Sequence, residues 1–159
     1  MSEGQPELPG RNKFVENLKV EKRYADAILT AWSAIEALMN GVILREYHLS
    51  SADHRADHLF DLDFEEKLNL QTKGNLLTEG EAKTVRLFQE RRNRLFHADG
   101  VWFTGIAESE KIELTELGID ALQIIEGLQI RSMKEETWRW DKRSFAQRQK
   151  RNREDSQHP

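Results

Sequence analysis

The residues whose types and spacing can do chemistry lie in one short segment, residues 92–97, with the sequence RNRLFH. Arg92 offers a charged, planar set of N–H donors that matches the geometry of phosphate oxygens. The imidazole of His97 titrates near neutral pH, so it can take up or release a proton. Asn93 and His97 have i, i+4 spacing and can hydrogen-bond on a regular helix. Together these side chains can support phosphoryl transfer without a metal ion.

The segment ends a helix that the sequence predicts over residues 78–97. Thr78 and Glu81 form a capping-box pattern at its start, and Asp99-Gly100 is typical of a turn after its end. Its apolar residues are Ala82, Val85, Phe88, Leu95 and Phe96. Arg92 falls on the same side as these residues. Because burying an unpaired guanidinium is costly, we expect Arg92 to reach a partner or to face a subunit interface.

Further helices are predicted before and after this one. Apolar residues recur at alternating steps of four and three over residues 24–47, which indicates a long amphipathic helix. We expect one or two short helices over residues 53–75, ending at Gly74. We expect an extended loop or hairpin over residues 101–112. Thr115 is predicted to cap a last long helix. Its expected apolar face is Leu117, Ala121, Ile124, Leu128 and Met133. The pattern predicts an all-α protein, an up-and-down bundle of four to five helices.

Composition divides the chain into three predicted regions. We expect a disordered lead over residues 1–12, the helical bundle over residues 13–140 and a basic tail over residues 141–159. Residues 142–153 carry six basic and no acidic side chains, whereas the rest of the chain has 18 basic and 28 acidic ones. A basic run can bind phosphate backbones, or it can be solvated and pair with the acidic body. Its neighbouring aromatic residues, which can stack on bases or pack on the bundle, are Trp138, Trp140 and Phe145.

Composition also excludes several function classes. The chain has no cysteine, so disulfide frameworks, thiolate metal sites and cysteine nucleophiles are excluded. His54 and His58 have i, i+4 spacing but no third ligand at a recognised distance, and we predict neither a metal nor a cofactor. No apolar run approaches the roughly 20 residues that span a bilayer, and the N-terminus lacks the apolar stretch of a signal peptide. We therefore expect a cytoplasmic protein without a membrane segment.

Arg92, Asn93 and His97 at a helix end match a known family signature. The segment resembles the R-x4-6-H motif of the HEPN superfamily in its RNxxxH form. The long preceding helix, with AWSAIE at residues 31–36, is similar to the first helix of that family, and EEKLNL at residues 65–70 leads to a glycine and the motif helix, as in several subfamilies. The resemblance covers roughly residues 20–130. It implies a HEPN-like bundle that forms a homodimer, and a metal-independent endoribonuclease with a composite site at the dimer axis.

The resemblance also implies roles for the motif residues. Arg92 would hold the scissile phosphate and stabilise charge in the transition state. His97 would be the general acid/base for attack by the neighbouring 2′-hydroxyl, and Asn93 would orient the histidine or the phosphate. The product would carry a 2′,3′-cyclic phosphate. Candidate RNA-binding residues around this centre and in the tail are Arg91, Arg94, Lys142, Arg143 and Arg148.

One departure from the family concerns the residues after His97. HEPN toxins encoded beside nucleotidyltransferase antitoxins typically carry a tyrosine two residues after the histidine, whereas this chain has Ala98 and Asp99. That subfamily and its antitoxin partner are therefore in doubt. Two interpretations stay open. The chain is an RNase, acting as a toxin or a phage-defence (abortive-infection) effector, or it is a non-catalytic helical module that dimerises or binds a partner. In the second case the same residues only cap the helix C-terminus.

Overall fold

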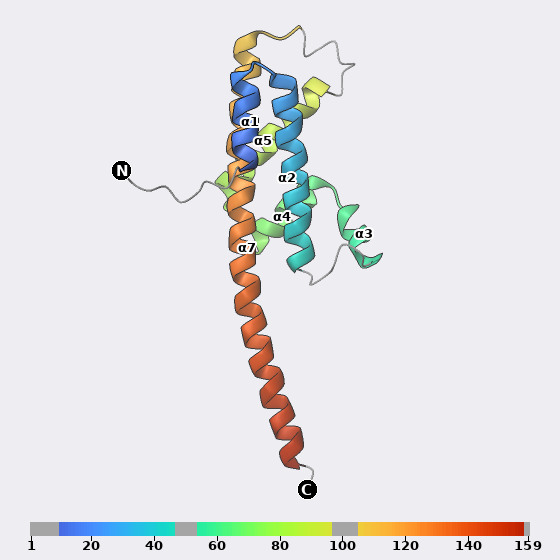
Figure 1. Ribbon diagram of the computed structural model, residues 1–159. Coiled ribbons are helices and arrows are strands. Elements are labelled where there is room, and N and C mark those ends of the chain that lie inside the picture. The colour runs from blue at the N-terminus through green and yellow to red at the C-terminus, as the bar shows by residue number, and fades with distance from the viewer. Residues whose placement is uncertain (1–9, 47–53, 97–104, 158–159) are drawn as a thin grey trace, which may run out of the picture.

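The computed structural model describes residues 10–46, 54–96 and 105–157, and these residues form six α-helices without a strand. In chain order the helices are α1 (Arg11–Val20), α2 (Tyr24–Glu46), α3 (His54–Phe60), α4 (Phe64–Lys73), α5 (Glu79–Phe96) and α7 (Glu108–Gln157) (Figure 1). The all-α prediction is confirmed for this part of the chain. The predicted number of four to five helices was too low for these residues because α1 was not predicted, whereas α3 and α4 match the one or two short helices expected over residues 53–75.

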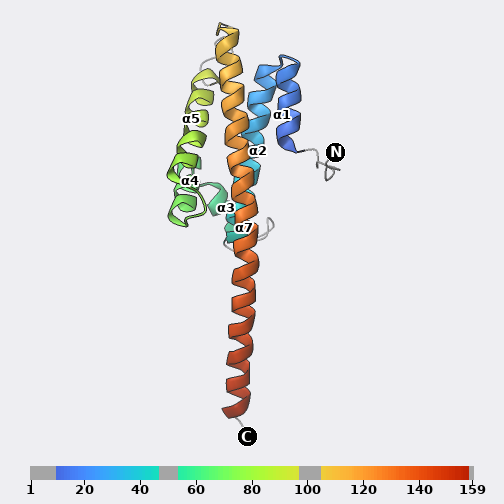
Figure 2. The ribbon, with the colours of Figure 1, turned by 90° about the vertical axis from the view of Figure 1, so that its left-hand side faces the viewer.

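Four of the helices, α1, α2, α5 and α7, pack along one long axis, and their directions alternate in chain order. The α1 helix turns back on α2 after Val20, and α7 runs beside α2 in the same direction (Figures 1 and 2). Two contacts fix α1 antiparallel to α7: Lys19 Nζ lies 2.9 Å from Glu116 Oε1, and Asn12 Nδ2 donates to Glu126 Oε2 at 2.6 Å. The α5 helix covers another side of α7 and runs opposite to it.

The α2 helix is the centre of the core. Its buried residues are Tyr24, Ala27, Ile28, Ala31, Trp32, Ile35, Leu38, Met39, Val42 and Ile43. Because these residues surround more than one side of the helix, α2 contacts α1, α3, α4 and α7. The ring of Trp32 meets Phe64 of α4, with 4.8 Å between centroids, and Phe88 of α5, with 6.1 Å. The tryptophan therefore joins α2 to both helices of the 64–96 segment.

The same apolar character makes α2 resemble a membrane segment. Within the described part of the chain, α2 is the one helix whose length and composition would allow it to cross a bilayer, a possibility that the sequence analysis had not expected. Half of its most apolar window is buried inside the bundle. A core helix of a soluble protein passes the same test, so this feature is weak evidence for a membrane location.

The predicted capping residues are confirmed at the start of α5, whereas the end of α4 differs in which residue is left-handed. The Thr78 backbone N–H donates to Glu81 Oε1, and the Glu81 backbone N–H donates to Thr78 Oγ1, each at 3.1 Å. This reciprocal pair confirms the capping box. Gly74 does follow α4, but its φ is −77° and the left-handed residue is Asn75, with φ 58°. Asparagine tolerates this conformation better than most residues, so glycine is not required there.

The start of the last helix was predicted wrongly. The α7 helix begins at Glu108, so the extended structure expected up to Ile112 is absent from its described part, residues 105–112. Thr115 lies inside α7, where its hydroxyl donates to the Lys111 carbonyl at 2.7 Å. A threonine hydroxyl can bond either a free N–H at a helix start or a carbonyl one turn back, and the sequence pattern does not distinguish them.

The buried face of α7 is also rotated from the predicted one. Its buried apolar residues are Leu114, Ile119, Ala121, Leu122, Ile125 and Leu128, whereas Leu117 and Ile124 are half-buried. Met133, which was predicted to lie on the core face, is 51% exposed. The prediction assumed that α7 buries one apolar face. In the structure α7 contacts three helices, α1, α2 and α5, so residues on several sides of it are buried.

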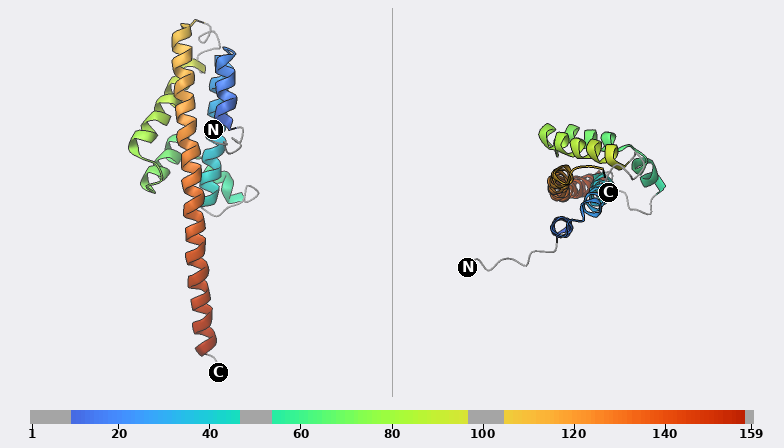
Figure 3. Two further views of the ribbon diagram at one scale, coloured as in Figure 1. Left: turned by 60° about the vertical axis from the view of Figure 1, so that its left-hand side comes forward. Right: turned by 90° about the horizontal axis from the view of Figure 1, so that it is seen from above.

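The predicted boundaries of the bundle do not coincide with breaks in the helices. The α1 helix begins at Arg11, within the predicted lead over residues 1–12, and residues 1–9 lie outside the described part of the chain. The α7 helix continues through the predicted boundary at residue 140 to Gln157 (Figure 3). The predicted tail therefore continues the last helix of the bundle.

Candidate functional site at the end of helix α5

The motif occupies the last turns of α5, where this helix faces α2. Phe96 is the last described residue of α5, and His97, the predicted acid/base, lies outside the described residues. Val85 and Phe88 are fully buried on the inner side of the helix. Arg92 follows them on that side, as the sequence predicted, and is half-buried. The helix therefore points one cation toward the core.

Arg92 is held by an aromatic ring and an amide. Its guanidinium carbon lies 5.3 Å from the centroid of the Trp32 ring and 6.0 Å from that of Phe96. Its Nη1 donates to the side-chain oxygen of Asn93 at 2.9 Å. A cation at this distance from a tryptophan face is stabilised by about 0.5–2 kcal/mol. Arg92 thus reaches a partner within the chain, one of the two outcomes expected from its position.

The Nε of this guanidinium is enclosed by the protein. It has no hydrogen-bond partner among the described residues. A buried N–H without an acceptor costs roughly 1–3 kcal/mol, and more when the group is charged. Because Nε is not accessible to solvent, a phosphate could accept a hydrogen bond from it only after neighbouring side chains move. The guanidinium as a whole matches phosphate oxygens, because an arginine fork can donate two parallel hydrogen bonds to them.

Asn93 contacts Arg92 in the described part of the chain. Its side-chain oxygen accepts a hydrogen bond from Arg92, its immediate neighbour. The predicted contact of Asn93 with His97 falls on a residue outside the described part of the chain. Among the described residues, the amide therefore orients the arginine. That Asn93 orients the histidine or a phosphate stays a prediction.

Arg91 and Arg94 lie on a different side of α5 from Arg92. Both line a pocket of about 340 Å³ between the end of α5 and the start of α7, together with Glu110 and Glu113. The two glutamates offset the positive charge that RNA would need there. The structure thus does not place these two predicted RNA-binding residues on a surface of purely positive charge. The other three, Lys142, Arg143 and Arg148, belong to α7 in the stretch whose side chains are not described.

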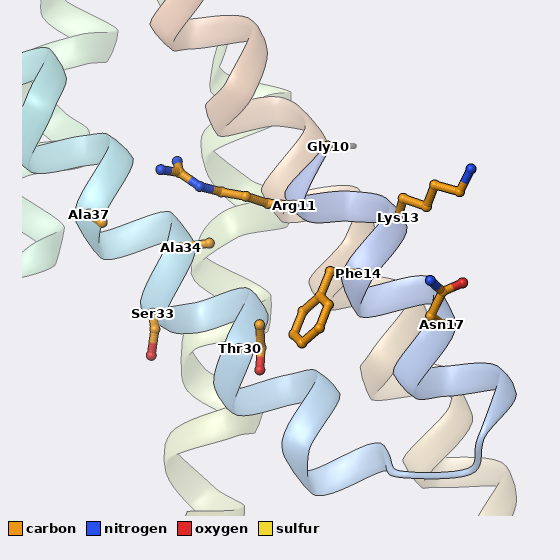
Figure 4. Close-up of a pocket in the computed structure, with 9 residues that line it drawn as sticks. All are labelled: Gly10, Arg11, Lys13, Phe14, Asn17, Thr30, Ser33, Ala34 and Ala37. Atoms are coloured by element: carbon orange, nitrogen blue, oxygen red, sulfur yellow. The ribbon is translucent and has the colours of Figure 1, made fainter. Parts of the chain in front are cut away.

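A second pocket lies between α1 and α2, away from the motif. It has a volume of about 670 Å³ and is shown in Figure 4. The Phe14 ring, 58% exposed, points from α1 toward Thr30, and Arg11 extends over Ala34. The remaining lining residues are Gly10, Lys13, Asn17, Ser33 and Ala37. None of the motif residues lines this pocket, and its lining contains no carboxylate or imidazole for acid/base work.

Lys67 is a buried charge outside the motif. Its ammonium donates to Asn40 Oδ1 and to the Phe60 carbonyl, each at 3.0 Å. Burial lowers the pKa of Lys67 below its ordinary value of 10.5, against the opposing fields of nearby carboxylates. A lysine with a lowered pKa can act as a base or nucleophile. Here its donors are used to join α3 and α4 to α2, so we assign it a structural role.

This structural role predicts a pH dependence. The free energy of unfolding of the wild type, relative to that of Lys67→Met, should rise as the pH approaches 10.5 from below. The folded state loses the Lys67 proton below 10.5, where the unfolded state still holds it, so the unfolded state binds more protons in that window. Urea unfolding of both proteins measures the difference. Lys73→Met, at an exposed lysine of the same helix, is the control for the loss of one positive charge. A flat difference for Lys67→Met would contradict the assignment.

The described residues contain no group of three or more His, Cys, Asp or Glu side chains arranged to hold a metal ion. Comparison with known proteins finds no matching family model, no matching curated protein and no matching solved structure. The site must therefore be interpreted from its own geometry and from the motif.

Proposed function

We propose that this chain is a metal-independent endoribonuclease of the HEPN type. The observation that carries the proposal is the position of Arg92, a half-buried guanidinium held by the Trp32 ring and the Asn93 amide. An arginine so oriented is suited to bind a phosphate, and it lies five residues before the histidine of the motif. The residues of this site thus combine a phosphate binder with an acid/base, which is the pair that the chemistry needs.

In the proposed reaction the RNA supplies its own nucleophile. His97 accepts the proton of a 2′-hydroxyl, and the 2′-oxygen forms a bond to the adjacent phosphorus while the bond from phosphorus to the 5′-oxygen breaks. The leaving 5′-oxygen takes a proton from an imidazolium, and the products are a 2′,3′-cyclic phosphate and a 5′-hydroxyl. Arg92 would donate hydrogen bonds to the phosphate as negative charge develops on its oxygens.

The proposed active species is a homodimer. The motif of one protomer would meet that of its partner across a two-fold axis, so that one imidazole serves as base and the other as acid. Such an RNase would act in the cytoplasm as a toxin or as an effector of abortive infection. A protein antitoxin is then a further proposed partner. The cleavage reaction itself can be tested without knowledge of this setting.

The test is cleavage of a mixed RNA pool in the presence of EDTA. We expect wild type to give fragments with 2′,3′-cyclic phosphate ends, and His97→Ala to cut at least about 100-fold more slowly. His58→Ala is the matched control, because His58 is an exposed histidine on α3 and should not alter the rate. Intact RNA with the wild type, or equal cleavage by the wild type and His97→Ala, would overturn the proposal.

A second candidate function is a non-catalytic helical module. The same contacts of Arg92 favour this function if they are purely structural, because Asn93 and Trp32 already stabilise Arg92 without a ligand. Glu110 and Glu113 beside Arg91 and Arg94 also suit a mixed-charge protein contact. The two functions differ in the cleavage assay: the module would dimerise or bind a protein while leaving RNA intact.

A further inference from the structure

The α7 helix extends far beyond the rest of the molecule. It contains 50 residues, from Glu108 to Gln157. Near the end of the bundle, Arg131 Nε donates to the Leu76 carbonyl at 2.8 Å, and its Nη2 lies 3.4 Å from Glu81 Oε2. In Figures 1 and 2 and in the left view of Figure 3, the helix then continues past every other helix. We call residues 135–157 the arm.

Because the arm is helical, its register sorts its cations onto faces. At about 100° per residue, five basic positions fall within an arc of about 100°. They are Arg139, Lys142, Arg143, Lys150 and Arg153. We call these five positions the basic face. No acidic residue between positions 139 and 153 falls in this arc, since Asp141 lies about 150° from its centre. Helix formation therefore gathers charge that is scattered in the sequence.

The register also changes the assignment of predicted RNA-binding residues. Arg148, predicted from the sequence, is placed about 170° from the centre of the basic face. Arg139, Lys150 and Arg153, which the sequence analysis did not select, join Lys142 and Arg143. The stripe from position 139 to position 153 is about 21 Å long at 1.5 Å per residue. Such a stripe can follow several successive phosphates of one strand.

Three aromatic positions flank the basic face, Trp138 and Phe145 on one side and Trp140 about 60° outside the other edge. Trp138 and Phe145 are seven residues apart, two turns of the helix, and both fall about 40–60° outside one edge of the arc. Cations beside aromatic rings are the combination that binds single-stranded nucleic acid, since the cations contact phosphates and the rings stack on unpaired bases. A duplex would not offer its bases to these positions.

We propose that the arm binds single-stranded RNA along the basic face. The choice of RNA rests on the proposed function, whereas binding through this face does not require cleavage. The other occupant that charge would allow is the acidic body of a second copy. RNA is favoured because the acidic body offers no bases to the flanking aromatic positions.

The test compares two pairs of arginine substitutions in the full-length chain. Arg143→Gln/Arg153→Gln removes two charges from the basic face, and Arg148→Gln/Arg151→Gln removes two from the remainder of the arm. The probe is a fluorescent 2′-O-methyl oligonucleotide of mixed sequence, which has no free 2′-hydroxyl to attack. Binding can thus be measured whether or not the protein is an RNase. Circular dichroism confirms equal helix content in both variants.

We expect the first variant to bind about tenfold more weakly than the second, and its plot of log affinity against log salt to be shallower by about 1.4. A duplex probe should bind more weakly than the single strand. An equal loss of RNA affinity in both variants would show that binding does not depend on the basic face. Absence of RNA binding by the wild type would overturn the proposal. If Arg143→Gln/Arg153→Gln binds the RNA probe as well as wild type does but has a different oligomeric mass, the basic face contacts a second copy of the chain instead.

Discussion

Arg92→Lys is expected to slow RNA cleavage at least about 100-fold while leaving the protein folded. The substitution keeps a positive charge beside Trp32 but removes the planar guanidinium and its unpaired Nε. Lysine presents a point charge, so it cannot donate two parallel hydrogen bonds to a phosphate. If Arg92 acts in the transition state, kcat and kcat/KM should fall together. Single-turnover cleavage with EDTA, beside a thermal melt, measures both properties.

Arg86→Lys is the matched control for this experiment. Arg86 is a half-buried arginine on the same helix, and its Nε and Nη2 donate to Glu65 at 2.6 Å and to Asn69 at 2.9 Å. Its replacement should lower stability by at most about 1 kcal/mol and leave cleavage unchanged. A purely structural Arg92 would give the reverse of the expected result: Arg92→Lys would alter the melt as Arg86→Lys does and cut RNA at the wild-type rate.

The environment of Arg92 was predictable only in part. Its place on the inner side of α5 follows from its spacing to Val85 and Phe88, which needs nothing beyond helical periodicity. That it would lie over Trp32 does not follow, because the two residues are 60 positions apart and belong to different helices. Periodicity assigns a residue to a face, but the angle and register of two packed helices decide which side chains meet. The sequence analysis assigned Trp32 only to the helix predicted over residues 24–47.

The errors in the fold have the same origin. The capping box at Thr78 was found because both of its partners lie within one turn of the chain. Thr115 was misassigned because its alternative partner, the Lys111 carbonyl, exists only once α7 has begun earlier. The short helix α1 was missed as an element because Val15 and Leu18, its two buried residues, make too short a pattern. Local signals were reliable where one turn contains the whole interaction, and unreliable where another helix determines the outcome.

A glycine on α7 couples the core to the candidate site. Gly118 faces Phe88, and a Cβ atom at Gly118 would lie 2.8 Å from Phe88 Cζ and 2.9 Å from its Cε1. Phe88 is fully buried, so its ring has little room to move, and its centroid lies 6.1 Å from that of the Trp32 ring. Any shift of the Phe88 ring would therefore displace the Trp32 ring, over which the Arg92 guanidinium lies.

We expect Gly118→Ala to lower the free energy of unfolding by about 1–3 kcal/mol, because the overpacking cost exceeds the gain of up to about 1 kcal/mol in helix propensity. Gly41→Ala is the matched control in the middle of α2, where a Cβ atom would meet nothing within 4 Å. It should stabilise the protein by about 0.5–1 kcal/mol. Urea unfolding of both variants gives the two values, which should have opposite signs.

The cause of the Gly118→Ala effect can be separated from a general loss of stability by adding Phe88→Leu. The smaller side chain removes the ring atoms that the new Cβ would meet, so the double variant should be more stable than the sum of the two single changes implies, by at least about 0.5 kcal/mol. Simple additivity would mean that the methyl group is accommodated by a movement of α7 instead. In that case the contact between Gly118 and Phe88 would not control the position of Trp32.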